Sequence, residues 1–160
     1  MLTLTTGKIT MIGFYRFAGL LAALLFGAGA YANDIQVDGA WTRVAAPGRD
    51  SASVFLFITS KQDAALVGAS SPAAKSVELR TMLHEGGMMK TINVKTIPLP
   101  ANKRVDMTSI HDYHLTLVGL KAPLKANATV PLTLNIEIPG KRNARIDVKV
   151  EVKPLKNADQ

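Results

Sequence analysis

The chain has 160 residues, no cysteine and a formal net charge of +7. Without cysteine it has no disulfide, no thiolate metal site, no cysteine nucleophile and no lipid-modified cysteine. Its basic residues are spread along the sequence rather than gathered with aromatic residues, so nucleic acid is not expected as a partner.

The first 32 residues have the three parts of a secretory signal peptide. Lys8 and Arg16 are positively charged, the run 17–30 holds only apolar and small residues, and Ala30-Tyr31-Ala32 has the small-x-small pattern of a cleavage site. That apolar run is shorter than the roughly 20 residues of a membrane-spanning helix. We therefore predict a signal peptide over 1–32, an exported protein with no stable membrane span after cleavage, and one domain over 33–160. An uncleaved anchor is the alternative.

From residue 35 onward, short runs alternate apolar and polar residues between turn formers, which predicts an antiparallel sandwich or barrel. The run 53–60 is largely apolar on both faces and is expected to be a central strand. Prolines make 97–102 an expected extended loop. The other predicted strands are 35–43, 64–70, 76–84, 88–94, 104–107, 114–120, 129–138 and 143–152. No helix longer than two turns is predicted.

The predicted strands 76–84 and 88–94 form a hairpin, because the glycines between them can adopt the positive φ angles of a tight turn. A period of two places Met82 and His84 on one face of the first strand. Met89 lies on the returning strand, and a short hairpin brings it near His84.

Every histidine of the chain, and every methionine outside the predicted signal, lies between residues 82 and 114: Met82, His84, Met88, Met89, Met107, His111 and His114. Thioether and imidazole together suit Cu(I), and no softer ligand is present in a chain without cysteine. The alternative is that methionine fills core gaps and histidine lies on loops. No nucleophile elbow, phosphate loop or zinc-hydrolase spacing is visible, so the protein is predicted not to be an enzyme.

Several segments resemble the periplasmic copper chaperones of the PCuAC family: 66–74, 77–79, 85–90, 113–115, 119–124 and 130–134. The resemblance extends over about 38–152. It implies an all-β, cupredoxin-like Greek-key sandwich or barrel in the periplasm. It also implies a role in copper homeostasis, in which Cu(I) is held for cytochrome c oxidase, with assembly proteins of that enzyme as partners.

The family's usual ligands are a histidine or methionine, a second methionine, and a closing His-x-Met. The matching positions here are Arg80, Thr91, His114 and Thr116, so only His114 is retained. Arg80 has no lone pair to give a metal, and threonine hydroxyls are hard donors that suit Cu(I) poorly.

Two hypotheses follow from this departure. In the first, copper, as Cu(I) more than Cu(II), is bound at a displaced metal site made of His114, His84, Met82 and Met89, while His111 and Met107 contribute less. The displacement is feasible because two residues along a strand move a ligand by roughly 7 Å. In the second, the protein is a metal-free binding or scaffold protein that keeps the fold.

Overall fold

The computed structural model describes residues 34–155, so the predicted signal peptide lies outside the described residues and stays a prediction. The described chain forms strands and no helix. Within it, therefore, no helix is long and apolar enough to cross a membrane. The ten strands are β1 (Ile35–Arg43), β2 (Ser51–Ser60), β3 (Ala64–Ser70), β4 (Ala74–Glu85), β5 (Met88–Asn93), β6 (Ile97–Leu99), β7 (Arg104–Met107), β8 (His114–Leu120), β9 (Thr129–Glu137) and β10 (Ala144–Lys153).

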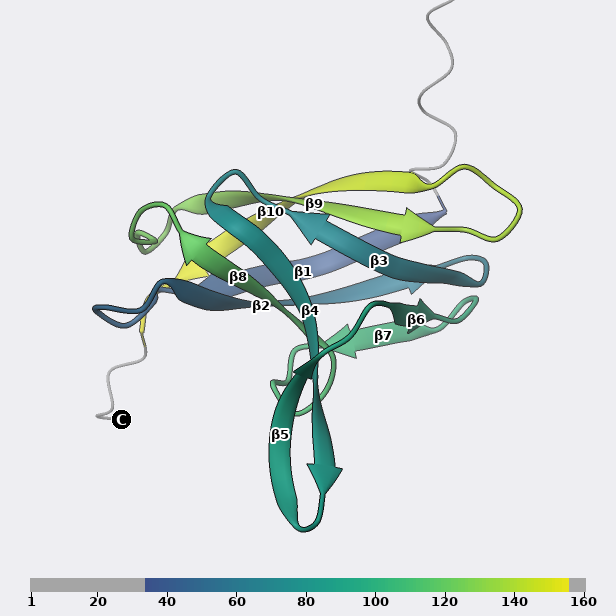
Figure 1. Ribbon diagram of the computed structural model, residues 1–160. Coiled ribbons are helices and arrows are strands. Elements are labelled where there is room, and N and C mark those ends of the chain that lie inside the picture. The colour runs from purple at the N-terminus through teal and green to yellow at the C-terminus, as the bar shows by residue number, and fades with distance from the viewer. Residues whose placement is uncertain (1–33, 156–160) are drawn as a thin grey trace, which may run out of the picture. The chain divides into compact units, whose positions relative to one another are not determined.

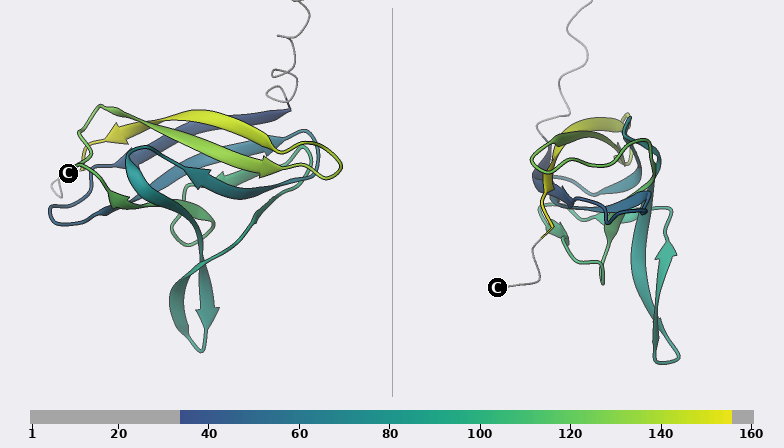
Figure 2. Two further views of the ribbon diagram at one scale, coloured as in Figure 1. Left: turned by 45° about the horizontal axis from the view of Figure 1, so that its top comes forward. Right: turned by 90° about the vertical axis from the view of Figure 1, so that its left-hand side faces the viewer.

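Seven of these strands close into a mixed barrel in the order β4-β8-β2-β1-β10-β9-β3, with β3 returning to β4. The pairing of β1 with β10 is parallel, and the other pairings in the ring are antiparallel. The end-on view in Figure 2 shows the ring of strands. The predicted all-β Greek-key barrel is confirmed, but the prediction that it is antiparallel is wrong for β1 and β10, which run parallel.

The barrel encloses a core of aliphatic side chains. Along β2, every second residue is buried, and Val54, Leu56 and Ile58 are fully covered. Strand β9 follows the same alternation, with Leu134 and Ile136 fully covered between more exposed neighbours. This period of two is the geometry of a strand with one face on the core, and it explains why the sequence pattern predicted these strands.

The segment predicted as an extended loop, 97–102, begins with a short strand instead. β6 pairs with β3 at an edge of the sheet, and Ile97 and Leu99 are buried in the core. Pro98 lies between them and is exposed. Proline restricts its predecessor to extended backbone and is tolerated on edge strands. Pro98 is therefore compatible with both the predicted extended loop and the observed strand.

The hairpin of β4 and β5 extends away from the barrel (Figure 1). β4 pairs with β8 as far as Arg80 and with β5 from Arg80 to its end. The hairpin turns at Gly86 (φ 59°) and Gly87 (φ 78°), which connect the opposed residues Glu85 and Met88. Positive φ at both central positions is the requirement of the tight hairpin turn that the sequence predicted.

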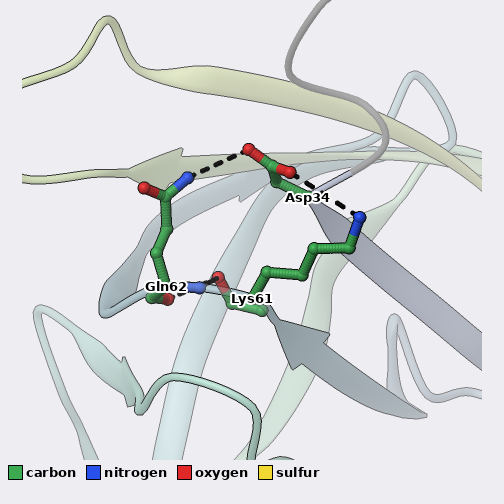
Figure 3. A network of polar contacts seen from close by, with 4 residues as sticks. Asp34, Lys61 and Gln62 are labelled. Atoms are coloured by element: carbon green, nitrogen blue, oxygen red, sulfur yellow. Dashed lines mark hydrogen bonds and ion pairs between the residues drawn. The ribbon is translucent and has the colours of Figure 1, made fainter.

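A polar cluster anchors the start of β1 to the turn between β2 and β3 (Figure 3). The Asp34 carboxylate accepts a hydrogen bond from the Gln62 side-chain amide at 3.1 Å and lies 3.8 Å from the Lys61 ammonium. The Lys61 backbone N–H donates to the Asp34 carbonyl at 2.8 Å. These contacts fix the first residue of the described chain to the barrel.

Candidate metal site

The candidate site lies on the face of β4 that points away from the barrel core. Opposed residues of an antiparallel pair project their side chains to the same side of the sheet. Leu79, on the other face of β4, is buried in the core. Four cross-strand pairs, each called a rung below, therefore follow one another along this outer face: Glu78 with Thr116, Arg80 with His114, Met82 with Thr91, and His84 with Met89.

The last rung brings together two of the predicted ligands. His84 on β4 lies directly opposite Met89 on β5, as the hairpin prediction required. Both side chains are exposed, and Met89 is 49% accessible. An imidazole and a thioether thus lie side by side on the hairpin, beyond the barrel. Met88 points to the opposite face of the hairpin, because it pairs with Glu85.

His114 has a different environment, at the start of β8. It is 4% exposed, and its Nδ1 lies 3.1 Å from the backbone carbonyl oxygen of Asp112. A carbonyl oxygen can only accept, so Nδ1 carries a proton, and in the neutral ring Nε2 has the lone pair. This is the arrangement that orients metal-binding histidines in proteins. His114 is therefore fixed in the tautomer that can bind a metal through Nε2.

The positions beside His114 do not offer metal ligands. The Arg80 guanidinium donates through Nε to the Glu78 carboxylate at 2.9 Å, and the two side chains form an ion pair. Thr116 is 4% exposed, and its hydroxyl oxygen has no hydrogen-bond partner in the described part of the chain. The Arg80 guanidinium, paired with Glu78, therefore lies at the position where the resemblance places the first ligand.

Met82 lies on the rung between Arg80 and His84 and is half-buried. A polar contact comes from outside the predicted site: His111, in the segment between β7 and β8, has its Nδ1 3.4 Å from the Met82 Sδ. Alternation locates residues within strands only, and 108–113 lies in none, so the sequence held no signal for this contact. Met107 is fully buried in the core, as expected for a methionine that fills space.

The predicted ligands thus lie on one face and in three groups. His84 and Met89 are neighbours, Met82 lies one rung nearer the barrel, and His114 lies one rung further, on β8. Successive rungs on one face are roughly 7 Å apart. Among residues 34–155, no three histidine, aspartate or glutamate side chains gather in a way that could hold a metal ion.

Comparison with known proteins places the chain among its relatives. Residues 35–152 match the family model described as "Putative lipoprotein LpqE-like". The chain is 30% identical to "Putative lipoprotein Lxx21020" of Leifsonia xyli over 84% of its own length and 81% of that protein. Both names describe lipoproteins, whereas this sequence contains no cysteine to which a lipid could be attached.

Solved structures agree with this assignment. The Cu(I) form of DR1885 from Deinococcus radiodurans is 33% identical and has a TM-score of 0.51, with 72% of this chain and 75% of that chain covered. The copper-bound PCuAC domain of PmoF2 has a TM-score of 0.59 at 18% identity, with 76% and 93% covered, and shows the shared fold. The chain therefore belongs to the LpqE-like family, and within the cupredoxin-like barrels it is a member of the PCuAC group.

Proposed function

We propose that this protein is exported and acts as a copper chaperone-like binding protein, not an enzyme, which holds Cu(I) at an altered site. The observation that carries the proposal is the row of thioether and imidazole side chains on the outer face of β4 and its neighbours. Met82, His84 and Met89 share that face with His114. Sulfur and imidazole nitrogen are the ligands that favour Cu(I), and the chain contains no thiolate that could compete with them.

The exposure of the row suits a protein that passes its metal on. His84 and Met89 are exposed on the projecting hairpin, Met82 is half-buried and His114 is buried. An incoming ligand of a partner can reach the exposed pair, whereas the buried imidazole lies at the barrel end of the row. A closed site with four buried ligands would hold a metal as a structural element instead.

The relatives support copper as the cargo. Solved structures of DR1885 and of the PmoF2 domain are of Cu(I)-bound and copper-bound forms. The finer proposal is that the protein acts in the periplasm and delivers Cu(I) towards cytochrome c oxidase through assembly proteins of that enzyme. Transfer of Cu(I) from the loaded protein to a purified copper-binding assembly protein of the oxidase, followed by separation of the two proteins, tests this step. Retention of all copper by the donor would contradict it.

The second candidate function is a metal-free binding or scaffold protein. It is favoured by the Arg80–Glu78 ion pair, which places a guanidinium where the family has a ligand. Only His114 remains of the four matching positions, and a fold alone does not fix function.

A Cu(I) titration of the purified exported protein against a competing chelator separates the two functions. We expect one Cu(I) ion per protein, and weaker binding in His114→Ala and His84→Ala. Met88→Leu is the matched control, because Met88 lies on the other face of the hairpin. Circular dichroism confirms that each variant is folded. Equal affinity in the parent and all variants, or no binding in any, would leave the scaffold function as the better account.

A further inference from the structure

The segment 108–113, between β7 and β8, brings a third imidazole to the face described above. His111 is exposed, and its Nδ1 lies 3.4 Å from the Sδ of Met82. Neither residue occupies a ligand position of the family pattern. The two side chains come from parts of the chain 29 residues apart, so the contact results from tertiary structure rather than from sequence proximity.

The distance between the two atoms is that of a hydrogen bond between imidazole and thioether, and it is also compatible with two ligands of one metal ion. With the zinc–sulfur distance of about 2.3 Å and the zinc–nitrogen distance of about 2.0 Å as a guide, two donor atoms of one tetrahedral metal ion are about 3.5 Å apart. The observed separation of 3.4 Å is close to this value. An ion could therefore bind both atoms without a large movement of either side chain.

We propose that Met82 Sδ and His111 Nδ1 are two ligands of the same Cu(I) ion, so that the segment 108–113 is a ligand-bearing part of the site. This inference rests on the proposed Cu(I)-binding function and names the ligand pair at its centre. Met82 occupies the middle rung, with His114 one rung towards the barrel and His84 one rung towards the hairpin tip. Either imidazole can complete the coordination from its side.

The backbone around His111 is held in place before any metal binds. The His111 N–H donates to the Ser109 hydroxyl oxygen at 3.1 Å, and the Asp112 N–H donates to the Ser109 carbonyl at 3.3 Å. The Asp112 carbonyl in turn accepts from His114 Nδ1. One short turn thus positions two imidazoles, and this organisation reduces the entropy lost on binding.

The charge near this pair also favours the middle rung. Arg80 lies one rung from Met82, and a guanidinium there would repel a cation. Its ion pair with Glu78 directs the guanidinium towards the residue two positions earlier in β4, away from the hairpin. The ion pair therefore reduces the repulsion that a cation bound by Met82 and His111 would experience from Arg80.

The test compares Met82→Leu and His111→Ala with the control Met88→Leu in the full exported protein. Met82→Leu removes the sulfur and keeps most of the volume. Even outer-shell partners of metal ligands cost about 10–100-fold in affinity when mutated, so we expect each of these two variants to lose at least about tenfold in Cu(I) affinity. The control is expected to bind Cu(I) as the parent does.

Nuclear magnetic resonance gives a second readout that does not depend on variants. At less than one equivalent of Cu(I), the Met82 methyl and His111 Nδ1 resonances should shift together, while those of Met88 and the buried Met107 stay in place. If the parent binds Cu(I) but either variant keeps its affinity, the shared site is overturned and the proposed function stands. If the parent binds no Cu(I), both are overturned.

Discussion

The barrel and the projecting hairpin share strand β4 but bury their side chains very differently. In the barrel, leucines such as Leu56, Leu115 and Leu134 are fully covered. On the hairpin, Leu83 is 42%, Met89 is 49% and Met88 is 74% exposed. A two-stranded hairpin is at best marginally stable by itself, so the barrel must supply the stability and the hairpin can present side chains to a ligand.

The boundary between the two regions is Arg80. It pairs with His114 of the barrel strand β8 and with Asn93 of the hairpin strand β5. The soft donor atoms lie close to this boundary, where a rigid scaffold and an exposed surface meet. Sites held by regular elements are more precise than sites on loops, and the proposed displacement of the site along β4 would keep most of its ligands on such elements.

The largest expected effect separates the two regions by stability. Leu56→Ala removes a fully covered side chain from the barrel core, and we expect a loss of about 2–5 kcal/mol in the free energy of unfolding. Leu83→Ala removes the same atoms from an exposed hairpin position, and we expect a loss below about 1 kcal/mol. Urea unfolding followed by circular dichroism measures both. Equal losses would mean that the hairpin contributes to the core.

The second prediction removes the hairpin tip. Leu83 and Lys90 are opposed and lie two pairs from the native turn, so they form a hydrogen-bonded pair of the same kind as Glu85 and Met88. An Asn-Gly turn in place of residues 84–89 would therefore connect them with favourable geometry. The shortened protein loses His84 and Met89 and keeps Met82, His111 and His114. We expect Cu(I) affinity to fall about tenfold, which corresponds to about 1.4 kcal/mol. The free energy of unfolding should change by less than that.

Two results of the shortened protein would contradict the comparison. A loss of stability as large as that of Leu56→Ala would make the hairpin part of the cooperative barrel. Unchanged Cu(I) affinity would show that the hairpin tip has no part in the site, and would leave Met82, with the imidazoles near the barrel, to bind the ion.

The third prediction compares two buried threonine hydroxyls of the barrel. The Thr42 hydroxyl donates to the Ser53 carbonyl at 2.7 Å, whereas that of Thr116 has no partner within the described residues. Thr42→Val should lower the free energy of unfolding by about 1 kcal/mol, because it leaves a buried carbonyl with one partner fewer. Thr116→Val removes an unsatisfied hydroxyl and should raise it by up to about 1 kcal/mol. Thermal unfolding of both variants checks the opposite signs.

Sequence patterns predicted the barrel strands well, because one-sided burial produces the alternation of β2 and β9 that is visible in the sequence. They also placed His84 next to Met89, since hairpin register follows from the glycine turn. The parallel pairing of β1 with β10 and the strand at Ile97–Leu99 depend on tertiary packing that no local pattern encodes. The contact between Met82 and His111 was missed for the same reason, because the backbone of an irregular segment has no fixed period.

The smallest effect concerns the start of the segment that carries His111. The Asp106 carboxylate accepts hydrogen bonds from the Thr108 hydroxyl at 2.6 Å and the Thr108 N–H at 2.8 Å, and Arg104 is nearby. The side-chain hydrogen bond from Thr108 is the largest cause, and together these contacts lower the pKa of Asp106 from its ordinary value. Folding thus favours the ionised form. The contribution of the Asp106 carboxylate to stability is complete above its pKa in the unfolded chain, about 3.9. This contribution disappears as the pH falls through the lower pKa of the folded state. Because Asp106 lies at the surface, where water screens charge, the contribution should be well below about 1 kcal/mol.

Asp106→Asn should therefore lower the urea midpoint slightly at pH 7, and the difference from the parent should vanish under strongly acidic conditions. A difference that grows as the pH falls would contradict the assigned role of the carboxylate.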